Sequence, residues 1–354
     1  MISVVSTVFN DKNGLERFFA SLQRQTRAPD EVVIVDAGST DGSWEVLESA
    51  SAAPHLSFPV QVIREPRCNV ARGRNLAIET ASGPLIASTD IGCDWEPRWL
   101  EDLVQPLLDN PSVQVVVGSW AVRPESLRGP WALTEWALKG DQKLVADAAS
   151  YSSSRTIAYR KTAWEALGRY PEDLTLAADD AVFHLLMEQA RVARIGAPSI
   201  NCYWHRHASL QAYLKEQYRY GLGDGEAGIR RRDVGLTGGR LLLECGGLVL
   251  GMAFLASPLA WLKATGGAAL ALALASFAVR FRSLNKPTGR LRDAGVSHPR
   301  LRLLLFVYAT KIWWLRGFFR GIRRGSRNCR QCRQRLREMN ADTFQARLTA
   351  VSQN

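Results

Sequence analysis

The sequence predicts an α/β protein with a doubly wound, mostly parallel sheet, followed by a C-terminal helical region that associates with a membrane. Two observations carry this prediction. Over the first 200 of the 354 residues, short runs rich in Val and Ile alternate with amphipathic stretches, and this alternation is typical of a mostly parallel sheet covered by helices. After residue 240, two long apolar runs follow one another, and they predict the helical region.

The expected strands are five short apolar runs, at residues 2–8, 31–36, 60–65, 84–89 and 114–118. The stretches between them carry apolar residues at helical spacing, at residues 14–26, 42–51, 69–81 and 98–109. In an open sheet of this kind, ligands bind at the carboxyl ends of the strands. The polar residues directly after each run are therefore the candidate site residues.

Charge divides the chain into two parts of opposite sign. Residues 1–200 hold 19 Lys and Arg against 26 Asp and Glu, whereas residues 201–354 hold 26 against 8. The composition, 46% hydrophobic and 22% charged, excludes a globally disordered protein. The basic part has the composition of a segment that lies against anionic lipid or nucleic acid. The apolar runs within it favour lipid, and we expect no nucleic-acid partner.

The two apolar runs predict a transmembrane helical hairpin over residues 241–282. The first run, residues 241–262, contains one ionisable side chain, Glu244, and is long enough to cross about 30 Å of hydrocarbon. We expect the turn between the runs at Lys263–Gly267. The alternative is a buried hairpin in a soluble protein. Lys and Arg cluster before and after the pair, so both ends should face the cytoplasm, with the catalytic domain on the cytoplasmic face of the cell membrane.

The remaining C-terminal chain, residues 283–354, is basic. Within it, residues 301–324 mix aromatic side chains with Arg and carry Lys311 near the middle. This pattern predicts an interfacial helix, with a third membrane helix as the alternative. Cys329 and Cys332 form a C-x-x-C in what we expect to be a basic tail rather than half of a metal site. The predicted organisation is a catalytic domain at 1–226, a linker at 227–240, the hairpin and this basic region.

Acidic residues follow several of the predicted strands. Asp36 closes one run, Asp90 with Asp94 comes at the end of another, and the pair Asp179–Asp180 opens a later amphipathic segment. Taken singly, such a residue is usually a turn former or a helix N-cap. Several carboxylates at one sheet edge repel one another and indicate a bound cation or a catalytic role.

Five motifs in order give the chain a family resemblance. They are TVFN at 7–10, VDAGSTDGS at 35–43, ARGRNLAI at 71–78, TDIGCDWEPRWL at 89–100 and the acidic pair about 90 residues later. This order resembles an inverting family 2 glycosyltransferase with the GT-A fold, over residues 1–225. The resemblance implies a hexosyltransferase-type enzyme that takes a sugar from a nucleotide-diphosphate donor.

The resemblance also assigns donor-binding residues. Contacts to the base and ribose would come from Thr7, Phe9, Asn10 and Asp36. Arg72, Arg74 and Asn75 would approach the diphosphate or the nearby acids, and Asp90 would bind the donor through a metal ion. Two guanidinium groups beside a helix start suit a pyrophosphate. Ala37 departs from the family pattern, in which many members have a second Asp that binds a pyrimidine base. The nucleotide is therefore not assigned.

A divalent metal ion, Mg²⁺ or Mn²⁺, is implied as the cofactor. Asp90 is its expected ligand, because hard cations prefer oxygen donors and take the remaining ones from phosphate and water. Asp94 is either a second ligand or the cap of the next helix. His205 matches a histidine that neighbours the metal or the diphosphate in this family, and its alternative is a surface histidine.

Catalysis is expected at the acidic pair. Asp180 would be the general base, because the acceptor hydroxyl must lose its proton as it attacks the anomeric carbon. Asp179 would lie on the acceptor side or cap the following helix. Arg155 would meet substrate phosphate or lie on a surface.

The acceptor prediction comes from the C-terminal part of the chain. A basic, apolar region beside the site suggests a membrane lipid, or a lipid-linked or membrane-presented acceptor, in polysaccharide or glycoconjugate synthesis. Glu216 and Tyr220 replace the Gln and Trp of the box found in processive synthases, so transfer of a single sugar is favoured. The alternative is a catalytically silent membrane scaffold of the same fold that binds nucleotide or polysaccharide.

Overall fold

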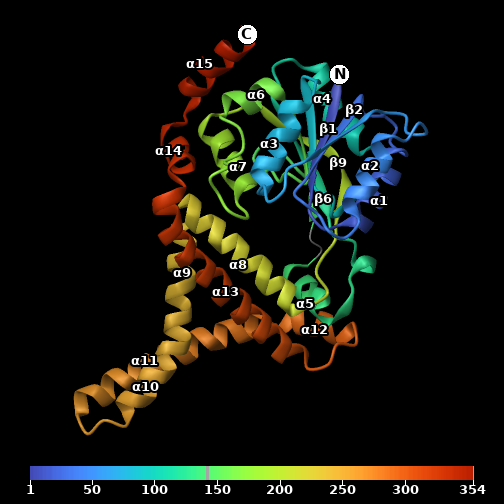
Figure 1. Ribbon diagram of the computed structural model, residues 1–354. Helices are drawn as coiled ribbons and strands as arrows, with labels where there is room; N and C mark the ends of the chain where they lie inside the picture. Colours follow the sequence, from blue (N-terminus) through green and yellow to red (C-terminus); the bar gives the residue numbers. More distant parts are fainter. Residues whose placement is uncertain (141–142, 354) are drawn as a thin grey trace. The chain divides into compact units, whose positions relative to one another are not determined.

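The computed structural model describes residues 1–140 and 143–353 (Figure 1). The chain forms two compact units. The first unit comprises Met1–Leu127, Asp141–Arg206 and Ile322–Asn354. The second comprises Arg128–Gly140 and His207–Gly321. The last residues of the chain thus belong to the unit that contains the N-terminal strands.

The first unit is built on one mixed β-sheet with the strand order β3-β2-β1-β4-β8-β6-β9-β5, and β7 pairs with β6. The strands are β1 (Ile2–Val8), β2 (Glu31–Asp36), β3 (Val60–Arg64), β4 (Leu85–Thr89), β5 (Cys93–Trp95), β6 (Val115–Ala121), β7 (Lys143–Leu144), β8 (Thr156–Arg160) and β9 (Arg194–Trp204). β1 to β4 pair in parallel, and β8 enters antiparallel between β4 and β6. The predicted α/β class is confirmed, with antiparallel pairing in the second half of the sheet.

Helices flank this sheet. They are α1 (Lys12–Leu22), α2 (Ser43–Ser51), α3 (Val70–Thr80), α4 (Trp99–Asp109), α6 (Lys161–Ala166) and α7 (Asp179–Gln189), with a 3₁₀ turn at Pro124–Ser126. α3 packs against β1 and β2, and α4 packs against β6 and β9. Val4 and Val33 are completely buried, as parallel strands covered on both faces require. The carboxyl ends of β1, β2 and β4 converge near Thr7, Asp36 and Asp90.

The C-terminal segment of the first unit consists of α14 (Arg330–Glu338) and α15 (Ala341–Ser352). α15 packs against α6, and α14 packs against α7. Cys329 Sγ lies 2.8 Å from the Asp173 carbonyl oxygen, and the Cys332 amide donates to the Asp173 carboxylate at 3.0 Å. Both thiols are completely buried. The segment around Cys329–Cys332 is basic, as predicted, but it is helical and packs on the first unit through these two cysteines.

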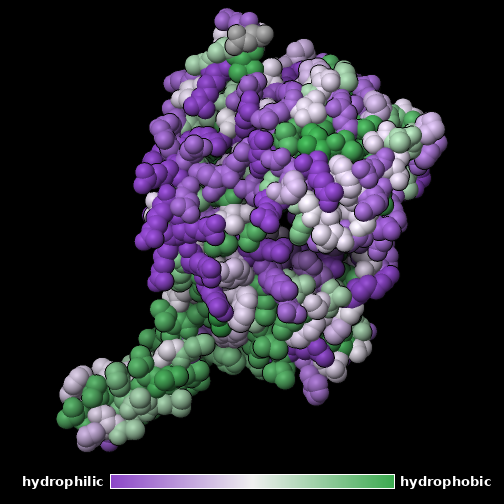
Figure 2. Space-filling model, viewed as in Figure 1, coloured by the Kyte–Doolittle hydropathy of each residue, from purple (hydrophilic) through white to green (hydrophobic). Residues whose placement is uncertain are grey.

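The second unit is helical. Its elements are α5 (Gly129–Lys139), α8 (Leu210–Ala227), α9 (Arg231–Leu241), a π-helical turn (Leu242–Gly246), α10 (Gly247–Leu255), α11 (Ala260–Ser283), α12 (Asn285–Asp293) and most of α13 (Pro299–Asn328). By length and composition, two helices here are long and apolar enough to cross a membrane, at Arg231–Leu255 and Ala260–Asp293. α10 and α11 form the predicted hairpin, and Figure 2 shows apolar side chains gathered over it.

The turn of the hairpin lies at residues 256–259, directly before α11, and not at Lys263–Gly267 as predicted. Pro258 ends the first helix, because its ring removes a backbone donor and disfavours helical geometry at the preceding residue. Gly266 lies inside α11, where a Cβ atom would come within 2.9 Å of the Gly251 carbonyl oxygen. The glycine that the sequence assigned to a turn therefore allows two helices to pack closely.

Docking of the C-terminal segment should protect its two cysteines. We expect maleimide to modify Cys329 and Cys332 at least about 100-fold more slowly in the native full-length protein than in urea, because access requires local opening that costs about 3 kcal/mol. Mass mapping of the labelled peptides measures both rates, with the partly exposed Cys68 as an internal reference. Native labelling of Cys332 at the unfolded rate would contradict the docked arrangement.

Candidate active site

The centre of the candidate site is the buried guanidinium of Arg74. Asn69 caps α3 by accepting a hydrogen bond from the Arg72 amide at 2.8 Å, and this fixes the helix start just before Arg74. The Arg74 side chain is 3% exposed. It donates to Asp90 at 3.1 Å, and it donates from its other terminal nitrogen to Asp179. One guanidinium thus joins the end of β4 to the start of α7.

Asp180 lies close enough to Arg74, Asp90 and Asp179 for their charges to act on it. Burial, and next the negative charge of Asp179, raise the pKa of Asp180 to about 6, although Arg74 and Arg155 act in the opposite direction. Asp90 also contributes to the increase. The structure therefore brings Arg74 and Asp90 together with Asp179 and Asp180, which lie about 90 to 105 residues further along the chain.

Arg155 directly precedes β8 and stacks on aromatic rings. Its guanidinium carbon lies 3.8 Å from the centre of the Trp204 ring and 4.8 Å from that of Trp120. The guanidinium of Arg206 also lies 3.8 Å from the Trp204 ring centre. Stacking of this kind holds a cation in place without neutralising it. Arg155 thus keeps its charge close to Asp180.

The predicted nucleotide residues surround the turn after β2. Asp36 is completely buried, and its carboxylate accepts hydrogen bonds from the Gly38 amide at 3.0 Å and from the Ser39 amide. Asn10 accepts from the Thr40 amide at 2.8 Å and so fastens the same turn to the end of β1. These bonds give Asp36 and Asn10 a clear role in shaping the turn, and their contact with a nucleotide stays a prediction.

Phe9 and Thr7, which were also predicted to contact the donor, differ in their surroundings. The Phe9 side chain is 62% exposed at the end of β1, so it is open to a ligand. Thr7 packs against α3, where a Cβ atom on Gly73 would come within 2.9 Å of the Thr7 methyl group. Gly73 is thus needed for the helix to approach β1.

The remaining two, Arg72 and Asn75, lie on α3 itself. Arg72 is partly exposed, and its guanidinium lies 3.7 Å from carboxylate oxygens of Glu65 and Glu172. The Asn75 amide is buried and donates to the Tyr170 carbonyl and to Glu172, at 2.9 and 2.8 Å. Its oxygen accepts from the Tyr170 amide at 3.0 Å. Asn75 therefore positions the chain that leads to the acidic pair.

Asp94 and His205 contact each other. His205 Nε2 lies 2.9 Å from an oxygen of Asp94, and Arg17 Nε lies 3.4 Å from its other oxygen. The hydrogen bond from His205, followed by the charges of His205 and Arg17, lowers the pKa of Asp94. Within residues 1–140 and 143–353, no three His, Cys, Asp or Glu side chains form a group that could hold a metal ion. Asp90, which is about half exposed, is the carboxylate that fits a metal ligated mainly by a substrate diphosphate.

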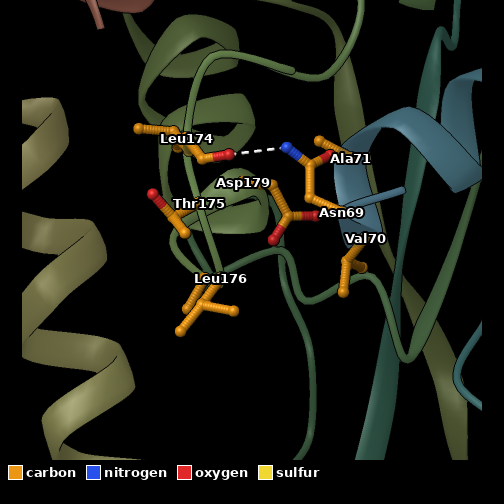
Figure 3. Close-up of a pocket in the computed structure, with 8 residues that line it drawn as sticks. Asn69, Val70, Ala71, Leu174, Thr175, Leu176 and Asp179 are labelled. Atoms are coloured by element: carbon orange, nitrogen blue, oxygen red, sulfur yellow. Dashed lines mark hydrogen bonds between the residues drawn. The ribbon is translucent and has the colours of Figure 1, made fainter. Parts of the chain in front are cut away.

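Sequence reasoning missed Asn69. Besides capping α3, its amide donates to the carbonyl oxygens of Glu172 and Leu174, at 2.7 and 2.6 Å. Figure 3 shows Asn69 and Asp179 on the wall of a small pocket between the start of α3 and the loop before α7. An Asn immediately before an amphipathic segment is an N-cap signal, and it could have identified this residue.

Removal of the Arg74 charge should destabilise the protein strongly. Arg74→Met leaves Asp179 buried without its partner, and a loss of this kind costs about 3–5 kcal/mol. We expect the unfolding midpoint of the detergent-solubilised protein to fall by at least about 6 °C in scanning fluorimetry. Arg72→Met, on the same helix but partly exposed, is the matched control and should shift the midpoint by about 1–2 °C. Equal shifts would show that the Arg74 pair is not the main support of the site.

Comparisons with known proteins find similarity to glycosyltransferases. Residues 3–168 match the model of the Glycosyl transferase family 2. The chain is 32% identical over 120 residues to validoxylamine A glucosyltransferase of Streptomyces hygroscopicus subsp. limoneus, covering 33% of this chain and 26% of that protein. It is 30% identical over 102 residues to glycosyltransferase AglE of Haloferax volcanii, covering 28% and 33%. The aligned segment thus spans about a quarter to a third of these relatives.

Two solved structures resemble the chain over most of its length. The mannosyltransferase PcManGT from Pyrobaculum calidifontis, in complex with GDP-Man and Mn²⁺, shares 21% identity over 93% of this chain and 87% of that one, with a TM-score of 0.48. S. aureus TarS 1–349 shares 14% identity over 90% of each chain, with a TM-score of 0.43. Taken with the motifs and the sheet, the match over residues 3–168 shows that this chain carries a family 2 glycosyltransferase domain.

Proposed function

We propose that the protein is a membrane-associated glycosyltransferase that transfers a single hexose, with inversion, from a nucleotide-diphosphate sugar to a membrane-presented or lipid-linked acceptor. One observation carries the proposal. The Arg74 guanidinium joins Asp90, at the expected donor edge of the sheet, to the acidic pair that contains Asp180. The family 2 domain over residues 3–168 supports the reaction class. The pathway would be polysaccharide or glycoconjugate synthesis.

The donor would bind along the ends of β1, β2 and β4. Phe9 offers an exposed ring for the base, next to the turn that Asp36 shapes. Arg72 would approach the diphosphate, because its guanidinium is partly exposed at the start of α3. Asp90 would hold a Mg²⁺ or Mn²⁺ ion together with diphosphate and water oxygens. When bound, such an ion supplies positive charge that stabilises the leaving diphosphate.

Asp180 would act on the acceptor. With a pKa of about 6, it is mainly ionised at neutral pH and still basic enough to take a proton. Its carboxylate would remove the hydroxyl proton of the acceptor as that oxygen bonds to the anomeric carbon and the bond to the diphosphate breaks. Attack from the side opposite the leaving group inverts the configuration. Arg74 would stay paired with Asp179, which leaves Asp180 as the carboxylate that takes the proton.

The hairpin would attach the enzyme to the membrane. The exposed side chains on α10 and α11 include Val249, Leu250, Met252, Leu272 and Leu274, which water solvates poorly. Basic residues before α10 and after α11 favour a topology with both ends in the cytoplasm. A catalytic domain held at the cytoplasmic face would meet an acceptor carried by a lipid.

Replacing the base should separate binding from catalysis. Asp180→Asn should leave the donor affinity nearly unchanged and lower transfer by at least about 100-fold. In the unmodified enzyme, transfer should rise between pH 5 and pH 7 with a midpoint near 6, since the base form increases with pH. Asp109→Asn, an exposed change on α4, is the control. Initial rates with a panel of nucleotide sugars measure both effects.

Two outcomes would contradict this assignment. Near-normal turnover of Asp180→Asn would place the base elsewhere. Binding of a nucleotide sugar by the unmodified protein, with neither transfer nor donor hydrolysis at any pH, would favour the silent scaffold.

Loss of Asp90 should affect the donor rather than the acceptor. We expect Asp90→Ala to weaken donor binding at least about tenfold in the presence of Mn²⁺, because it removes the proposed protein ligand of the ion. Asp94→Ala tests the second predicted ligand and should have little effect, since Asp94 is paired with His205. Calorimetry with and without Mn²⁺ measures both variants. Unchanged affinity of Asp90→Ala at saturating Mn²⁺ would exclude the metal role.

The hairpin should resist extraction without detergent. Full-length protein should stay in the membrane pellet in carbonate, whereas a variant with Leu250→Asp and Leu272→Asp should be released. The reason is that a charged residue at the centre of a membrane helix costs about 2.5–3.5 kcal/mol. Leu108→Asp, on the exposed face of α4, is the control and should not change the pelleted fraction. Release of the unmodified protein by carbonate would exclude insertion.

A further inference from the structure

A group of charged residues lies at the base of the hairpin. We call it the basal cluster, and its members are Arg240, Glu244, Arg280, Tyr308 and Lys311. Glu244 is 1% exposed, and it accepts hydrogen bonds from Arg240 at 2.9 Å, from Arg280 at 2.8 Å and from Tyr308 at 2.6 Å. One carboxylate therefore ties α9, α11 and α13 together within the second unit.

The basal cluster carries more positive than negative charge. Glu244 is the one carboxylate that pairs with Arg240 or Arg280 in the described part of the chain. Lys311 follows Tyr308 by three residues on α13 and so lies on the same face of that helix. Over residues 1–140 and 143–353, Lys311 makes no ion pair. Three cations against one carboxylate leave an excess of two positive charges.

Lys311 is close enough to the other two cations for their charges to act on it. Burial, and then the charges of Arg280 and Arg240, lower the pKa of Lys311. Such repulsion in a partly buried place is unfavourable, and an anion beside the three cations would relieve it. The cluster therefore has the electrostatics of an anion site.

The position of the cluster indicates which anion is available. Beyond Glu244 and Arg280, the hairpin exposes mainly apolar side chains (Figure 2). From Ala260 to Arg280, α11 rises about 30 Å, which matches the thickness of the hydrocarbon layer. If α11 crosses the membrane, Arg280 lies at the level of the lipid headgroups, where the available anion is a phosphate.

We propose that Arg240, Arg280 and Lys311 form a binding site for the phosphate of an anionic membrane lipid, with Glu244 and Tyr308 holding Arg280 in place. This inference rests on the membrane attachment proposed above. Arg240 is partly exposed, so its terminal nitrogens can form a fork toward a phosphate while its Nε bonds Glu244. Lys311 adds a point charge, and the site would select anionic over zwitterionic lipids.

The test uses full-length protein in detergent micelles and native mass spectrometry, with phosphatidylglycerol and phosphatidylcholine as the two probes. We expect phosphatidylglycerol to bind more tightly. Lys311→Gln should weaken it about fivefold, the effect of one basic residue near an anionic lipid, and Lys311→Arg should restore it. Neither substitution should change phosphatidylcholine binding. Lys263→Gln, which removes an equal charge near the other end of α11, is the matched control and should leave phosphatidylglycerol binding unchanged.

Several results would overturn the proposal. Equal affinity for the two lipids would exclude a phosphate site with a preference for anionic lipid, and an equal loss in Lys263→Gln would show a general charge effect. Displacement of the lipid by millimolar inorganic phosphate would assign the site to a free anion.

Donor binding is measured on the same preparations. A protein that binds nucleotide sugar without preferring phosphatidylglycerol contradicts only this inference, whereas one that binds the lipid but no donor contradicts only the proposed function.

Discussion

The pairing of Arg74 with two acidic residues is the interaction on which the candidate site depends. Asp90 and Asp179 come from a strand end and a helix start, and without a cation between them their carboxylates would repel. Because Arg74 is buried and cannot lose its proton, it places a permanent positive charge between the two groups. Burial, and next the negative charge of Asp179, raise the pKa of the neighbouring Asp180. Of the two neighbouring carboxylates, Asp179 bonds this guanidinium, and Asp180 carries the raised pKa.

The loop before the acidic pair is supported from two directions. On one side, Asn69 and Asn75 of α3 bond the chain between Tyr170 and Leu174. On the other side, the C-terminal segment bonds the same loop, through Cys332 to Asp173 and through Arg335 to the carbonyls of residues 168 and 169. The last part of the chain thus helps to fix the acidic pair, although it lies more than 150 residues away.

The parts of the fold that could be predicted are those that depend on local pattern. The first strands are buried on both faces, so each is a run of Val and Ile that stands out from its flanks. The polar residue after the fourth run gave Asp90, whereas the role of the acidic pair came from the family resemblance. What could not be predicted depends on distant partners: the docking of Cys329 on Asp173, and the pairing of Asp94 with His205. The predicted position of the hairpin turn was wrong because glycine is common both in turns and where two helices pack closely, and Gly266 belongs to the second case.

The raised pKa of Asp180 also carries a cost in stability. A carboxyl group whose pKa is about 6 in the folded protein, against 3.8 as its ordinary value, is ionised more easily when unfolded. Folding stability therefore falls as the pH rises from about 4 to about 6, by on the order of 3 kcal/mol from this group. A helix N-terminus would normally favour the charged form, so burial beside Asp179 outweighs it here. This unfavourable group lies where the proposed mechanism needs a base, and the Arg74 ion pairs and the packed C-terminal helices stabilise the structure around it.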